Sequence, residues 1–189
     1  MRWRAYFITV GAILFLRSLD LFITFHYTPD LKGEWNPLVS FFGMSWTGFL
    51  LIQLCIVAFI SLLMVFYFNR KPAAIDQTGL SFYDFAYVYF FGKLRPWPRR
   101  MFTFPTNISR HLVFNGFVFM FIAIGVSVFA VAHNMLLILH CEAYMLFVAI
   151  HANLYFPACF VLITIASVYA FFIIEYASYK RNRNAVFNG

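Results

Sequence analysis

The first candidates for a functional site are an Arg, an Asp and a Thr inside a strongly apolar stretch. Arg17 and Asp20 are three residues apart and Asp20 and Thr24 are four apart, so a helix would place all three on one face. Charged side chains within a membrane are costly unless they pair with each other or face a polar cavity. We therefore predict a buried polar site at Arg17, Asp20 and Thr24. The alternative is a purely structural ion pair that fixes the register of the helix.

A short loop rich in turn-forming residues follows this stretch, over residues 28–37. Glu34 and Asn36 could fold back over the outer end of the first helix, near His26, and we assign both to the same polar site. Two other interpretations stay open. Asn36, followed by a proline, also suits a helix cap and a first helical residue, and Glu34 could be a solvated loop acid.

These positions resemble a pattern found in an uncharacterised family of small prokaryotic integral membrane proteins. The pattern, LD…T…GxExNPL, is matched here by Leu19-Asp20, Thr24, Gly33-Glu34 and Asn36-Pro37-Leu38. The resemblance covers roughly residues 15–65. It implies a compact helical hairpin and no established activity. The chain departs from the pattern in a long aromatic loop and in a second half that carries histidines.

The histidines form a second group of residues that could do chemistry, because imidazole is a common metal ligand and a proton relay. On a single helix over residues 133–151, three histidines would share a face, but they would lie about 10 and 16 Å apart along the axis, too far to bind one metal ion. We predict no metal or other cofactor, and instead a wetted, titratable outer face made of His26, His133, His140, Glu142 and His151. Ligation of haem or a pigment by a single histidine, or a proton path, remains an alternative.

The composition requires membrane-spanning helices to position these side chains. Of the 189 residues, 63% are hydrophobic and only 11% are charged, which excludes an ordinary soluble domain, where about a quarter are charged. A helix needs about 20 apolar residues to cross a membrane. Four windows reach that length, at about 5–27, 45–68, 111–132 and 153–179. We predict an all-α fold, a single transmembrane domain over residues 1–189.

The segment 134–152 is nearly apolar enough to be a fifth span. Its histidines and Glu142 make it a poor lipid-facing helix, so we predict an extracytoplasmic or re-entrant helix there. Glu175, near the end of the last span, is expected to pair with Lys180 or to serve as an interfacial anchor.

The positions of the basic residues predict the orientation. If the chain crosses four times, twelve of its fourteen Lys and Arg residues fall on one side, and the positive-inside rule makes that side cytoplasmic. We therefore expect both termini in the cytoplasm and the protein in a prokaryotic inner membrane. The net charge of +7 then favours membrane lipids, not nucleic acid, as a partner.

The predicted cytoplasmic loop, residues 69–110, contains an aromatic segment over residues 80–91 that is followed by glycine and cations. Aromatic rings beside cations are typical of a segment at the membrane interface. A docking surface for a partner subunit is the alternative. Asn107-Ile108-Ser109 matches the N-glycosylation pattern, but the predicted topology leaves it in the cytoplasm and unused.

No common nucleotide-binding, zinc-protease or serine-hydrolase motif occurs in the chain, and its three cysteines have no metal-binding spacing. Our first hypothesis is a non-enzymatic subunit or scaffold of a larger membrane assembly, with other subunits or a second copy as partners. The second is a small oligomeric transporter or proton- or ion-conducting protein that uses Asp20 and Glu34. The third is a lipid-binding or lipid-modifying enzyme that pairs Asp20 or Glu34 with His26 or His140.

Overall fold

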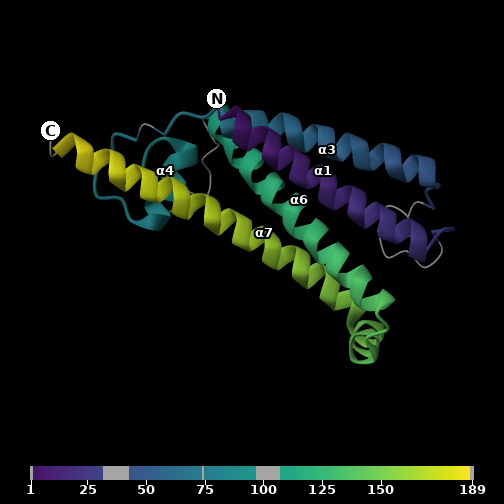
Figure 1. Cartoon of the computed structure of the whole chain (residues 1–189). Coiled ribbons are helices and arrows are strands. Elements are labelled where there is room, and N and C mark those ends of the chain that lie inside the picture. The colour runs from purple at the N-terminus through teal and green to yellow at the C-terminus, as the bar shows by residue number, and fades with distance from the viewer. Residues whose placement is uncertain (1, 32–42, 74, 97–106, 188–189) are drawn as a thin grey trace.

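The computed structural model describes residues 2–31, 43–73, 75–96 and 107–187, and its regular elements in those ranges are helices (Figure 1). They are α1 (Trp3–Tyr27), α3 (Trp46–Phe68), α4 (Phe82–Phe91), α6 (Ile108–Ile138) and α7 (Glu142–Phe187). Four stretches are long and apolar enough to cross a membrane: α1, α3, α6 and the Leu154–Asn182 part of α7. The predicted all-α fold with four spanning helices is confirmed.

Helix α6 is the central element. It packs against α1, α3 and α7, while α1 also packs against α3. Figure 1 shows α1 and α3 on one side of α6 and α7 on the other, with both chain ends and α4 gathered at one end of the helices. We call this end the basic end, because Arg2, Arg70, Lys93, Arg110 and Lys180 lie there. The other end is called the outer end.

Side-chain caps set the first residue of three helices. The side-chain oxygen of Ser45 accepts from the backbone N–H of Gly48 at 3.4 Å, and that of Ser81 accepts from Asp84 at 3.2 Å. Asn107 Oδ1 accepts from the Arg110 N–H at 3.1 Å. Such caps satisfy backbone donors that have no partner within the helix. The Asn107 cap explains why α6 begins before residue 111, the start predicted from hydropathy.

The predicted additional helix over residues 134–152 is shorter in the structure, where Glu142–Ala152 form an apolar helical segment. Helix α6 continues to Ile138, and a tight turn follows in which His140 has a positive φ of 50° and the Cys141 N–H donates to the Leu136 carbonyl at 3.2 Å. Residues 142–152 are the first turns of α7. Apolar composition alone could not locate this turn, because the residues on both sides of it are equally hydrophobic.

The first turns of α7 run in a different direction from the rest of the helix. In Figure 1 they are the green coil at the outer end, seen nearly end-on, whereas the rest of α7 crosses the view. Pro157 lies within α7. It has no N–H to donate to the carbonyl four residues earlier, and its ring crowds that carbonyl, so a proline inside a helix bends it.

Helix α4 places the aromatic segment inside the protein. Phe85, Val88 and Tyr89 are buried, and α4 packs against both α6 and α7. Two tyrosines of α7 hold the chain before it, since the Tyr176 hydroxyl donates to the Leu80 carbonyl at 3.0 Å and the Tyr179 hydroxyl donates to the Gln77 carbonyl at 2.8 Å. The buried face of this segment is therefore part of the core. The position at the membrane interface and the partner-docking surface stay predictions for its other face, which carries Tyr83.

Helices α3 and α6 pass close to each other at Gly116 of α6. A Cβ atom at this position would overlap the Leu63 carbonyl oxygen of α3 and would lie 3.3 Å from the Tyr67 Cβ. Small residues at such crossings let helix backbones approach closely within a membrane. Gly116 therefore sets the distance between α3 and α6.

We expect Gly116→Ala to lower the free energy of unfolding by about 1–3 kcal/mol, because the added methyl group forces α3 away from α6. Gly11→Ala is the matched control, since nothing lies within 4 Å of where its Cβ would be. It should be neutral or slightly stabilising, as Gly within a helix costs about 0.5–1 kcal/mol relative to Ala. Circular dichroism during denaturation of both variants in one detergent tests this. Equal destabilisation by the two changes would contradict the close crossing.

Candidate functional site

The predicted polar site at Arg17, Asp20 and Thr24 forms a cluster with a fourth residue, Asn134 of α6. Arg17 Nη1 lies 3.7 Å from Asp20 Oδ2. Asn134 Nδ2 donates to Asp20 Oδ1 at 3.2 Å and to Thr24 Oγ1 at 3.4 Å. The amide of Asn134 thus ties α6 to two residues on one face of α1.

The cluster is largely shielded. The Arg17 and Asp20 side chains are 17% and 16% exposed, and Thr24 is buried. Within an apolar medium, the opposite charge on Arg17 and the amide donor of Asn134 both stabilise the ionised Asp20 carboxylate. The arrangement can fix the register of α1 on α6, and its carboxylate can also exchange a proton. The other two predicted members of the site, Glu34 and Asn36, lie outside the described residues.

Sequence reasoning missed Asn134 because it placed the end of the third span at residue 132. Once α6 is known to reach Ile138, Asn134 falls within a spanning helix, where an amide side chain normally requires a polar partner. A hydropathy window extended beyond residue 132 would have placed Asn134 inside the third span.

One of the five residues of the predicted titratable outer face does not lie on the surface. His133 is buried, and its Nδ1 lies 2.6 Å from the Tyr144 hydroxyl of α7. The other four members, His26, His140, Glu142 and His151, are exposed. His133, His140 and His151 do not share one helix, because the turn between α6 and α7, which contains His140, separates His133 from His151. Within the described part of the chain, no three His, Cys, Asp or Glu side chains are placed to hold a metal ion.

A second charged pair, at the basic end, was not predicted. Arg70, just after α3, places both Nε and Nη2 at 2.8 Å from Glu175 Oε1 of α7. The guanidinium also donates from Nη1 to the Tyr67 carbonyl at 3.2 Å and lies 3.9 Å from the Tyr67 ring centroid. Glu175 is only 4% exposed. The expected pairing with Lys180 is therefore wrong, because the Lys180 ammonium lies over the Tyr176 ring, 4.7 Å from its centroid.

Arg110 holds the end of α4 against the start of α6. Its Nη1 donates to the Tyr89 carbonyl at 2.8 Å and to the Val88 carbonyl at 3.4 Å. Carbonyls in the last turn of a helix carry partial negative charge, so a cation there is stabilising. The Val88 carbonyl also accepts from the backbone N–H of Gly92 at 2.8 Å. Burial raises the pKa of the Tyr89 hydroxyl above its ordinary range, which keeps this side chain neutral.

A cavity of about 520 Å³ opens between the end of α3, the start of α6 and α4. Three cations, Arg70, Lys71 and Arg110, line it together with the polar side chains of Asn69, Asn107 and Ser109. Its apolar wall comes mainly from Val65, Phe66 and Val113. The sequence had marked these cations only as boundary residues, because those after α3 and those before α6 are far apart along the chain.

Comparison with family models, curated proteins and solved structures gives no match. The resemblance of the first hairpin to a small prokaryotic membrane-protein family therefore stays a prediction.

We expect a double-mutant cycle to reveal the Arg70–Glu175 pair. Glu175→Gln leaves the guanidinium without its charge partner and should lower the free energy of unfolding by about 3 kcal/mol. The double variant Arg70→Gln, Glu175→Gln should lose less free energy of unfolding than the sum of the two single variants. The difference, which is the coupling energy, should be about 0.5–3 kcal/mol. Denaturation in detergent provides the measurement.

Lys180→Gln is the control for this cycle, since Lys180 is exposed. It should change stability little and should not couple to Glu175→Gln. Coupling to Lys180 without coupling to Arg70 would overturn the assignment.

Proposed function

We propose that the protein is a non-enzymatic integral membrane subunit or scaffold of a larger membrane assembly. We further propose that it lies in a prokaryotic inner membrane with its basic end, and hence both termini, in the cytoplasm. The observation that carries the proposal is the use of polar side chains to join helices. Asn134 and Asp20 join α6 to α1, and Arg70 and Glu175 join the end of α3 to α7. These contacts hold the spanning helices in fixed positions relative to one another, as a structural subunit requires.

The open arrangement of the spanning helices supports the same proposal. Helix α7 packs mainly against α6 and α4 and leaves a row of large apolar side chains exposed. Leu162, Ile165, Tyr169 and Ile173 are between 50% and 65% exposed, and their spacing of three or four residues puts them on one face. Lipid chains can cover such a row, and so can an apolar helix of another subunit. We assign this face to the partner subunit.

Photo-crosslinking tests this assignment. A photoreactive amino acid at Leu162 should form an adduct of defined mass with another protein chain in native membranes. The same probe at Leu54 of α3, which is 62% exposed, is the matched control and should give mainly lipid adducts. Purification in mild detergent should recover the same partner in fixed proportion. A monodisperse single chain with lipid adducts at both positions would count against a scaffold role.

Transport is the second candidate, and the observation that favours it is the Asp20 carboxylate within a spanning helix. Acids at such positions are typical of proton and ion paths, because their charge can be neutralised as the surroundings change. Four spans are few for a single carrier, so this function would need an oligomer. A lipid-modifying enzyme that pairs Asp20 with His26 or His140 has less support, since both histidines are exposed whereas Asp20 contacts Arg17 and Asn134.

Flux into proteoliposomes tests the transport function. Asp20→Asn keeps the size of the side chain but removes its negative charge and its ability to bind and release a proton, so it should abolish proton or cation flux. Asp76→Asn is the control, because Asp76 is an exposed carboxylate between α3 and α4, and this change should leave the flux intact. Flux that survives Asp20→Asn would exclude this carboxylate as the carrier of protons.

A further inference from the structure

We propose that the cavity at the basic end is a binding site for a phosphate group, carried either by the headgroup of an anionic phospholipid or by a small soluble molecule. The cavity lies where the apolar part of α3 ends at Phe68 and α6 begins at Ile108. The ends of spanning helices lie at the depth of the lipid headgroups. This inference does not depend on the partner proposed above.

The charge of the cavity wall suits an anion. Arg70, Lys71 and Arg110 bring three positive charges to it, and no Asp or Glu is among the described residues of its lining. Glu175 offsets one charge through its ion pair with Arg70, and this pair also fixes the guanidinium at the wall. Arginine held in place in this way suits the geometry of phosphate oxygens.

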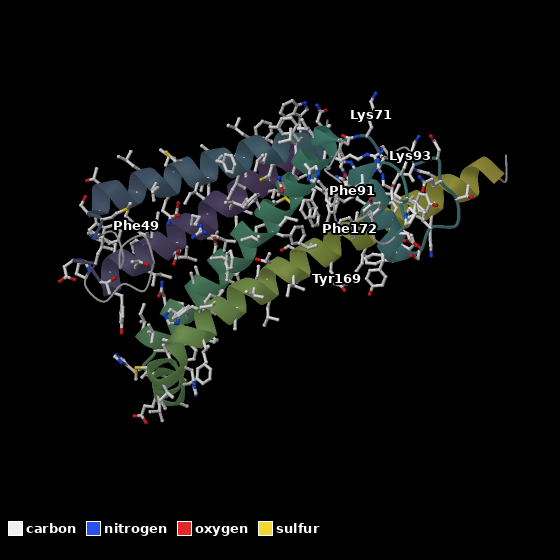
Figure 2. All side chains as sticks on the ribbon, turned by 180° about the vertical axis from the view of Figure 1, so that it is seen from behind. Phe49, Lys71, Phe91, Lys93, Tyr169 and Phe172 are labelled. Atoms are coloured by element: carbon white, nitrogen blue, oxygen red, sulfur yellow. The ribbon has the colours of Figure 1, made fainter. Side chains whose placement is uncertain are left out.

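Lys71 supplies an adaptable cation at the rim. Figure 2 shows it at the edge of the molecule, near the end of α3, with Lys93 at the same end. Both lysines are exposed, but only Lys71 is among the residues that line the cavity. The long flexible side chain of a lysine can reach a nearby phosphate as a point charge.

Uncharged donors complete the polar side of the cavity. Ser109, in the first turn of α6, is exposed and lines the cavity. The backbone N–H groups of this turn carry partial positive charge, since the first residues of a helix have no carbonyl partner within it. Here the helix start adds to a cavity that already carries cations.

The apolar wall favours a lipid as the source of the phosphate. Val65 and Phe66 of α3 and Val113 of α6 line the cavity on the side of the spanning helices. An anionic phospholipid could place its phosphate among the cations and its first acyl carbons on this wall. A soluble phosphate compound would use the polar side alone.

Native mass spectrometry of the purified full-length chain tests the site. Phosphatidylglycerol should be retained more strongly than phosphatidylcholine, whose headgroup carries no net charge. Lys71→Gln should weaken phosphatidylglycerol binding about fivefold, the effect of one cation near an anionic lipid. Ser109→Glu should weaken it further, because it places a carboxylate in the cavity while an acid in the first helical turn leaves α6 stable.

Two matched controls lie at the same end outside the cavity lining. Lys93→Gln removes an exposed lysine, and Thr78→Glu adds an acid at an exposed position. Neither should change lipid retention. If Lys71→Gln and Ser109→Glu bind phosphatidylglycerol no more weakly than these controls, the proposal is overturned.

Competition separates the two sources of phosphate. The competitors are glycerol 3-phosphate and inorganic phosphate. A soluble ligand is supported if either one displaces the lipid and raises the unfolding temperature relative to chloride at equal ionic strength. Retention of phosphatidylglycerol against both competitors supports a lipid. Equal retention of phosphatidylglycerol and phosphatidylcholine, with no effect of either phosphate compound, would exclude the site.

Discussion

The ion pair between Arg70 and Glu175 connects parts of the protein that α6 otherwise separates. Arg70 follows α3, on one side of α6, and Glu175 belongs to α7, on the other (Figure 1). A carboxylate that is only 4% exposed is stable as a charge only with a close partner. The pair therefore fixes the basic end of α7 relative to α3. The same guanidinium forms part of the cavity wall, so the structural contact and the proposed binding site share one residue.

The position of α4 follows from this arrangement. Within the turn of α7 that follows Glu175, the hydroxyls of Tyr176 and Tyr179 hold the chain that leads into α4. Arg110 of α6 binds the Val88 and Tyr89 carbonyls in the last turn of α4. Phe85 and Tyr89 then fill the space between α6 and α7. Aromatic side chains bury a large apolar area and prefer tilted or edge-to-face contacts, as between Tyr89 and Phe171, whose planes meet at 82°. Aromatic side chains thus fill the space between α4 and α7 at the basic end, beside the open cavity.

The outer end is held together differently. There the contacts between helices are hydrogen bonds, from the Asn134 amide to the Asp20 carboxylate and between His133 and Tyr144. They join α6 to α1 and to the bent start of α7. The basic end is thus held by a buried ion pair and aromatic packing, whereas the outer end is held by hydrogen bonds. The carboxylate on which the transport hypothesis depends, Asp20, lies at the contact between α1 and α6.

Hydropathy and helical spacing are local properties of a chain. They were therefore enough to predict the all-α fold, the four spans, the cations at one end, and the common face of Arg17, Asp20 and Thr24. The tertiary structure alone decided that Asn134 meets Asp20, that Glu175 pairs with Arg70 and not Lys180, and that the segment 80–91 is partly buried. These spanning helices are apolar on all sides, since lipid and protein neighbours are equally apolar, so periodicity does not reveal which face points inward. That choice depends on contacts between distant residues, such as the crossing at Gly116 and the turn at His140.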